Sequence, residues 1–125
     1  MFIRLYDDDE RDLYVQLADE IIRLMAEGSL TAGEELPSIR KLASSLNVNV
    51  KTVQAAYQKL ADEGFILLRK KATALVSREL FSEATWMNRW QKTFTRFHHE
   101  CLAQNLSEEE IEETIKTLLK KGETL

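Results

Sequence analysis

The sequence has few of the residues that shape disulfide-linked, membrane or secreted proteins. Among 125 residues it has one cysteine and one proline. The single cysteine, Cys101, excludes a disulfide within the chain, so we expect a reducing, cytoplasmic compartment. No apolar run approaches the ~18 residues of a membrane span. The amino-terminal segment lacks the basic-then-apolar order of a secretory signal.

Residues typical of catalytic and metal sites are also scarce. The four glycines are scattered, so no phosphate-cradling loop is present, and no serine, histidine and acid stand in a recognisable catalytic context. His98, His99 and Cys101 lie close together, but a transition-metal site takes three or four ligands and the sequence has no other Cys or His. We therefore expect no enzyme, no metal and no cofactor.

Charge is unevenly distributed along this chain of formal net charge −4. Residues 37–78 hold eight Lys or Arg and two acids, Asp62 and Glu63, which gives the segment a charge of +6. The remainder holds nine basic and nineteen acidic residues and has a charge of −10. A basic field confined to one part of an acidic protein indicates a polyanionic partner for one face.

Apolar periodicity and turn residues predict a mainly helical fold with a small β element. We expect a helix capped by Asp12 and ended by Gly28, a short helix capped by Ser38, a helix at 50–63 capped by Asn49, a hairpin of strands 65–68 and 73–76, and two helices in the last third. The second and third helices have the spacing of a helix-turn-helix. Ala43 allows their close approach, Asn47 tolerates a left-handed backbone, and Val53 fills the crossing.

The outward face of the third helix carries no carboxylate. Its apolar stripe, which includes Tyr57, is expected in the core. The residues left outside are Asn49, Lys51, Thr52, Gln54, Ala55 and Gln58. Gln can bond adenine, Lys can reach guanine acceptors, and Thr can bond a phosphate or touch a thymine methyl. The face therefore predicts contact with DNA.

Three motifs, "LYVQLADEI", "GSLTAGEELPSIRKLASSLNV" and "KTVQAAYQKLADEGFI", resemble the DNA-binding domain of the GntR family of bacterial transcription regulators. The resemblance covers about residues 11–77 and implies a winged helix-turn-helix, with the 65–76 hairpin as its wing. The implied DNA contacts, together with the two caps, are Ser38, Arg40, Asn49, Lys51, Thr52, Gln54, Lys70 and Lys71. The chain departs from the family pattern at Val50, where many members have Arg, and at the wing tip, which lacks glycine.

The last third carries an aromatic stripe at helical spacing, followed by a helix that opens with the capping box of Ser107 and Glu110. A small winged helix cannot cover two Trp and two Phe, so we expect a two-fold dimer that buries them. The expected dimerisation residues are Trp86, Trp90, Phe94, Phe97, Ile111, Ile115 and Leu118. The alternative is that the aromatic helix packs on the first helix of its own chain. A tail of two helices resembles the YtrA-like branch of the family.

These observations predict a winged helix-turn-helix DNA-binding domain at 11–78 and a helical dimerisation tail at 79–125. The expected function is a homodimeric transcription regulator, a repressor of a near-palindromic operator. The resemblance to the YtrA-like branch implies control of a transporter operon. No pocket signature for a small-molecule effector is seen. The rival hypothesis is a winged-helix protein-interaction module, for which acids or large apolar residues would be expected on the Lys51 face.

Overall fold

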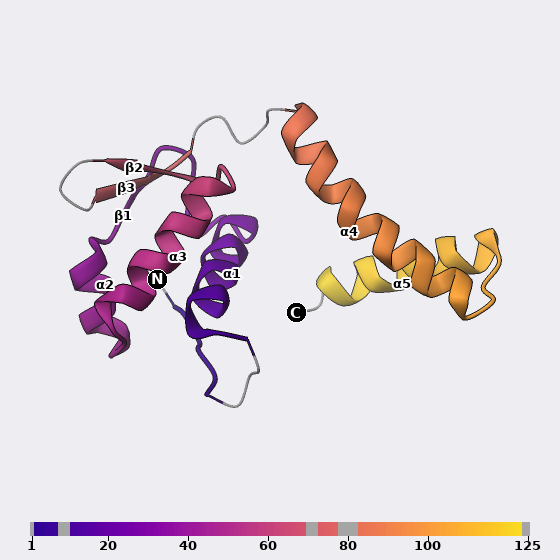
Figure 1. The fold of residues 1–125 in the computed structure, drawn as a ribbon, viewed down its shortest axis with the longest axis horizontal. Coiled ribbons are helices and arrows are strands. Elements are labelled where there is room, and N and C mark those ends of the chain that lie inside the picture. The colour runs from indigo at the N-terminus through magenta and orange to yellow at the C-terminus, as the bar shows by residue number, and fades with distance from the viewer. Residues whose placement is uncertain (1, 8–10, 70–72, 78–82, 124–125) are drawn as a thin grey trace. The chain divides into compact units, whose positions relative to one another are not determined.

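The computed structural model describes residues 2–7, 11–69, 73–77 and 83–123. The chain divides into two compact units, Met1–Leu80 and Phe81–Leu125 (Figure 1). The predicted boundary between residues 78 and 79 lies outside the described residues. None of the described helices combines the length and the apolar character that a bilayer crossing requires.

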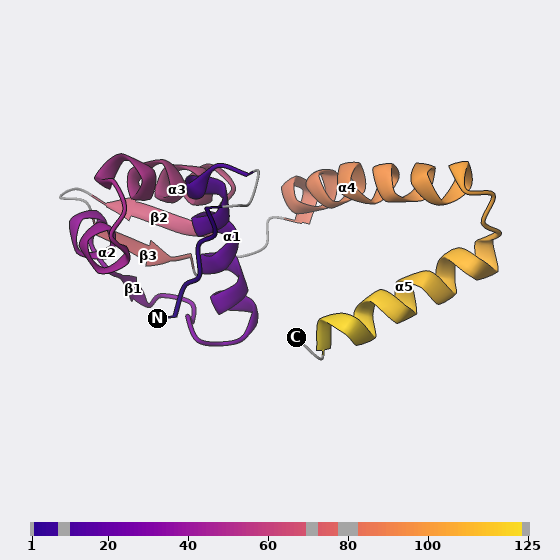
Figure 2. The ribbon, with the colours of Figure 1, turned by 90° about the horizontal axis from the view of Figure 1, so that it is seen from below.

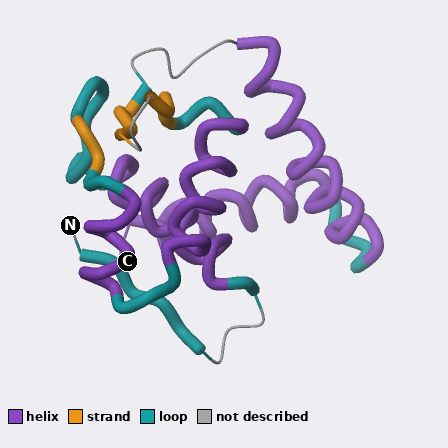
Figure 3. The backbone as a smooth tube through the Cα atoms, turned by 60° about the vertical axis from the view of Figure 1, so that its left-hand side comes forward, coloured by secondary structure: helices purple, strands orange, loops and turns teal. Residues whose placement is uncertain are grey.

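The first unit contains three described helices and an antiparallel sheet, which confirms the predicted winged-helix arrangement. Its elements are α1 (Leu13–Ala26), β1 (Glu35–Leu36), α2 (Ile39–Leu46), α3 (Val50–Asp62), β2 (Ile66–Arg69) and β3 (Thr73–Val76). The sheet has the order β1-β3-β2. The strands, orange in Figure 3, lie together at one end of the unit, and the helices fill the rest.

Helix α3 packs against α1, α2 and β2 and lies between α1 and α2 in Figure 1. One face of α3 is fully buried: Val53, Ala56, Tyr57 and Leu60 have no exposed surface. The hydroxyl of Tyr57 donates a hydrogen bond to the carbonyl oxygen of Pro37 at 2.6 Å. The placement of Tyr57 in the core is therefore confirmed, and its hydroxyl ties α3 to Pro37, which precedes the N-cap of α2.

The caps around the turn between α2 and α3 form as the sequence predicts. Ser38 Oγ accepts from the Lys41 N–H at 3.2 Å, and Asn49 Oδ1 accepts from the Lys51 N–H at 2.8 Å. Asn47 ends α2 in the left-handed region, with φ 56° and ψ 45°. The side chains of Ser38 and Asn49 thus mark where α2 and α3 begin, and the left-handed backbone of Asn47 marks where α2 ends.

The cap expected at the start of α1 differs from the prediction. Asp12 occupies the N-cap position, but its side chain makes no capping hydrogen bond. Its carbonyl oxygen accepts from the N–H groups of Val15 and Gln16. The helix therefore begins at the expected residue without a side-chain cap.

Strand β1 is absent from the sequence prediction, which treats this segment as a connector. Glu35 pairs with Leu75 and Leu36 with Ala74, and the Val76 N–H donates to the Glu34 carbonyl oxygen at 2.9 Å. A two-residue strand is too short to show the alternation of apolar and polar residues by which strands are recognised in a sequence. Strand β1 is identified only by its pairing with β3, about forty residues later.

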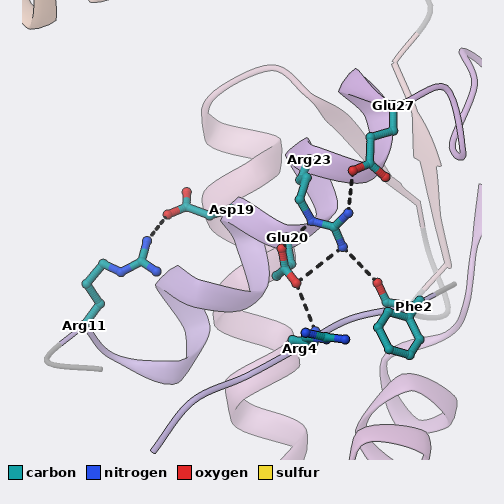
Figure 4. Close-up of polar contacts among 7 residues, drawn as sticks. All are labelled: Phe2, Arg4, Arg11, Asp19, Glu20, Arg23 and Glu27. Atoms are coloured by element: carbon teal, nitrogen blue, oxygen red, sulfur yellow. Dashed lines mark hydrogen bonds and ion pairs between the residues drawn. The ribbon is translucent and has the colours of Figure 1, made fainter. Parts of the chain in front are cut away.

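The amino-terminal arm is bound along α1 by polar contacts (Figure 4). Gln16, only 2% exposed, accepts from the Tyr6 N–H at 2.8 Å and donates to the Tyr6 carbonyl oxygen at 3.0 Å. Glu20 accepts from the Arg4 N–H, and Arg23 donates to Glu20 and to the Phe2 carbonyl oxygen. Burial opposes the ionisation of Glu20, but these hydrogen bonds outweigh it and lower its pKa.

The second unit is a helical hairpin of α4 (Glu83–Ala103) and α5 (Glu108–Glu123), visible in Figure 2. Asn105 turns the chain between them with φ 62°. The predicted capping box is confirmed: the Ser107 N–H donates to Glu110 at 3.0 Å, and the Glu110 N–H donates to Ser107 Oγ at 3.2 Å. The bond from the Ser107 main chain, assisted by its hydroxyl, lowers the pKa of Glu110.

Replacing Tyr57 with Phe is expected to lower the free energy of unfolding by about 1–2 kcal/mol at pH 7, because the bond to Pro37 is lost. Burial raises the pKa of Tyr57 to about 12 from the model-compound value of 10.0. The unfolded phenol therefore ionises first, and wild-type stability due to this group is present below pH 10 and lost as the pH rises towards 12. Urea unfolding of both proteins should show a smaller difference at pH 11 than at pH 7. An unchanged difference would contradict the burial of the hydroxyl.

Asn47 offers a second test, of the turn itself. Asn47→Ala places a Cβ-bearing residue without a local polar partner in the left-handed region, which costs about 1 kcal/mol. Asn47→Gly is the matched control, since glycine adopts this conformation freely. Denaturant midpoints should rank Gly close to wild type and Ala clearly below both. Equal midpoints for the two variants would show that the backbone leaves this conformation in solution.

Candidate nucleic-acid interface

Six of the predicted contact residues lie on α2, α3 and their caps. Because α2 packs against α3, the two helices form one structural element. Arg40, Asn49, Lys51 and Gln54 are exposed, whereas Ser38 and Thr52 are half-buried. Lys70 and Lys71, the predicted wing-tip contacts, lie outside the residues that the structure describes.

The acids nearest to this surface along α3 are already engaged. Asp62 Oδ1 accepts from Gln58 Nε2 at 2.8 Å, and Glu63 pairs with Lys59 at 3.2 Å. Both acids lie at the carboxy-terminal end of the helix. At the other end, neither Arg40 nor Lys51 forms an ion pair with any residue that the structure describes. Positive charge without a local counter-charge is what a phosphate backbone binds.

The structure adds to the sequence interpretation at Gln58 and at Lys41. Gln58 is exposed, but its amide is bonded to Asp62 and is less available for a base than that of Gln54. Lys41 is exposed and follows Arg40 directly, but it lines a hollow that also contains Glu27, Glu34 and Glu35 and no residue of α3, so it is not counted with the α3 surface.

The amino-terminal end of α3 presents an apolar side chain, Val50, among polar and cationic ones. Asn49 uses its side-chain oxygen for the cap, and Val50, the first residue of the helix, is 44% exposed. One turn later Gln54 is exposed on the same side. This end of the helix therefore carries no carboxylate, so that it can approach a base edge closely.

The wing contributes a second exposed surface next to the helices. Strand β2 is an edge strand, and its residues Leu67, Leu68 and Arg69 are exposed. Strand β3 between β1 and β2 keeps Ala74 and Val76 buried. The wing is thus anchored by β3, and β2 faces solvent along one edge.

The second unit carries an apolar groove between its two helices. Trp90 and Phe94 are 44% and 49% exposed, and Leu118 and Leu119 are more exposed still. The groove between α4 and α5 has a volume of about 770 Å³. Its lining consists of Trp90, Thr93, Phe94, Phe97, Ile115, Leu118, Leu119 and Gly122. Of the other predicted dimerisation residues, Trp86 and Ile111 are buried within the chain.

The described residues contain no group of three or more His, Cys, Asp or Glu that could hold a metal ion. Cys101 is buried as part of the α4 stripe, and His98 stacks on Phe94 with ring centroids 5.8 Å apart.

Comparison with known proteins gives consistent matches. The family model "Bacterial regulatory proteins, gntR family" matches residues 13–76. The HTH-type pyridoxine biosynthesis transcriptional regulator PdxR of Corynebacterium glutamicum is 35% identical over 78 residues, which are 62% of this chain and 17% of that protein. The HTH-type transcriptional repressor YtrA of Bacillus subtilis is 37% identical over 62 residues, 49% of this chain and 48% of that protein. The chain thus spans less than half of the length of both curated relatives.

A solved structure extends the likeness to the tail. YtrA from Sulfolobus acidocaldarius, a GntR-family transcription factor, has a TM-score of 0.65 and 39% sequence identity, and the match covers 95% of this chain and 97% of that one. The family model spans 64 of the 125 residues and the YtrA match nearly all of them. The protein therefore belongs to the GntR family of bacterial regulatory proteins, as a YtrA-like member with a winged helix-turn-helix and a helical tail.

Proposed function

We propose that the protein represses transcription by binding a near-palindromic DNA operator as a homodimer. The single observation that carries the proposal is the surface of α2 and α3, where Arg40 and Lys51 are exposed without an ion-pair partner among the described residues. A helix face that carries cations and no carboxylates attracts the negative charges of a phosphate backbone. Family membership adds a DNA-binding helix-turn-helix.

The groove of the tail supports the homodimer. Its lining is almost entirely apolar, and an exposed apolar surface of this kind marks an interface. A two-fold axis would bring the grooves of two copies together and hold two copies of α3 at a fixed separation. Each α3 would then read one half-site in the major groove, with half-sites about 34–36 Å apart or at a multiple of that distance.

Repression follows most simply from occupation of a promoter by this dimer. Phosphate neutralisation supplies much of the affinity, so binding is expected to weaken steeply with salt, and a few base contacts select the sequence. The YtrA of Bacillus subtilis, similar over the DNA-binding part, is named a transcriptional repressor. Control of a transporter operon, implied by the resemblance, stays a prediction, as does cytoplasmic location.

Selection from random duplex DNA, followed by footprinting, tests DNA recognition. Wild-type protein should enrich a near-palindromic consensus, and Arg40→Ala should weaken binding to it by about tenfold or more, the effect of one lost charged contact. Lys59→Ala is the matched control, because Lys59 is on α3 but pairs with Glu63; we expect a change within about twofold. Failure of the wild type to enrich any sequence at moderate salt would favour the protein-interaction module.

Sedimentation of the free protein tests the dimer. At micromolar concentration the wild type should sediment as a dimer, and Phe94→Glu should produce a monomer, because it places a carboxylate in the apolar groove. Gln91→Glu adds the same charge on α4 at an exposed position outside the groove lining, and it should leave the dimer intact. A monomeric wild type would contradict the proposal and favour packing of the tail on its own chain.

A further inference from the structure

We infer that Val50 reads a thymine in each half-site through contact with its C5 methyl group. The inference rests on the proposed function and assigns a specificity-determining residue within it. Val50 is the first residue of α3 and is 44% exposed, on a surface whose other exposed members are polar or charged. The first residues of a recognition helix are those that reach base edges.

The fold gives Val50 no packing role that accounts for its side chain. Val48, two residues earlier, packs against the core, as do Val53 and Ala56 on the buried face of α3. Val50 is 44% exposed, whereas the other large apolar residues of α3, Val53, Tyr57 and Leu60, have no exposed surface. A β-branched residue is also a weaker helix former than the polar alternatives, so local stability does not favour it there.

The chemistry of the neighbouring groups narrows what Val50 can contact. It has no hydrogen-bonding atoms, so it cannot distinguish bases by their donors and acceptors. The thymine methyl is the one apolar group that a major-groove base edge presents. The Asn49 side chain is held in the cap and cannot supply a competing polar contact from its Oδ1.

Gln54 places this thymine within the half-site. Val50 and Gln54 are four residues apart on one face of α3, so their Cβ atoms are about 5–6 Å apart. Base pairs are stacked about 3.4 Å apart. An adenine bonded by Gln54 would therefore lie within about two base pairs of the thymine that Val50 contacts. The expected core of each half-site is rich in A·T pairs.

Replacement of single thymines by deoxyuridine, which lacks only the methyl group, tests the inference directly. The duplex is the consensus selected by the wild-type protein, and each thymine of one half-site is replaced in turn. Wild-type affinity should fall about fourfold at one thymine, the effect of one buried methyl group. Val50→Ala should bind the thymine duplex more weakly by a similar factor and should show no further loss with deoxyuridine at that position.

Lys51→Ala is the control for weakened binding in general, since it should lose affinity yet keep the wild-type response to deoxyuridine. Circular dichroism of Val50→Ala checks folding, and Val50→Thr, which keeps the shape and one methyl, provides a second variant. The inference is overturned if the half-site has no thymine, if no deoxyuridine weakens wild-type binding, or if Val50→Ala responds as the wild type does. If the wild type selects no sequence, the proposed function itself fails. The other three outcomes overturn only the role of Val50 and leave the proposed function standing.

Discussion

The burial of one face of α3 is the constraint on which the rest of the first unit depends. Val53, Ala56, Tyr57 and Leu60 are sealed between α1, α2 and β2. Because a helix has a fixed 3.6-residue period, burial of this face leaves the opposite face of α3 exposed. The same packing holds α2 and its Arg40 beside α3. The position of the surface is thus a consequence of the core, and the hydroxyl of Tyr57, bonded to Pro37, ties the two together.

Several acids of this unit are paired, whereas Arg40 and Lys51 on one surface form no ion pair with a described residue. In α1, Glu20 is held by Arg23 and by the main chain of the arm. In α3, the carboxy-terminal acids are engaged by Gln58 and Lys59. An acidic protein can in this way present a local positive surface, because the potential near a surface depends on nearby uncompensated charge more than on the net charge.

In the tail the unmet requirement is burial of apolar surface and not compensation of charge. Two amphipathic helices alone cannot cover their own apolar side chains. The hairpin buries Cys101 and Ile111, yet Trp90 and Phe94 stay about half exposed. Local features nevertheless fix the hairpin: Asn105 takes the left-handed turn, and the capping box of Ser107 and Glu110 starts α5. Local interactions therefore define the helical hairpin, but the hairpin does not bury its own apolar side chains. This exposed apolar surface is suited to an interface.

The sequence alone determined the features that rest on near neighbours in the chain. Helix faces follow from apolar period, and the roles of Ser38, Asn47 and Asn49 follow from side chains that bond main-chain groups two or three residues away or tolerate a left-handed backbone. Only the tertiary structure decided that β1 pairs with β3, that buried Gln16 holds the arm, and that Asp12 leaves α1 without a side-chain cap. These depend on groups brought together by folding, and short strands and single polar side chains carry no periodic signal of such partners.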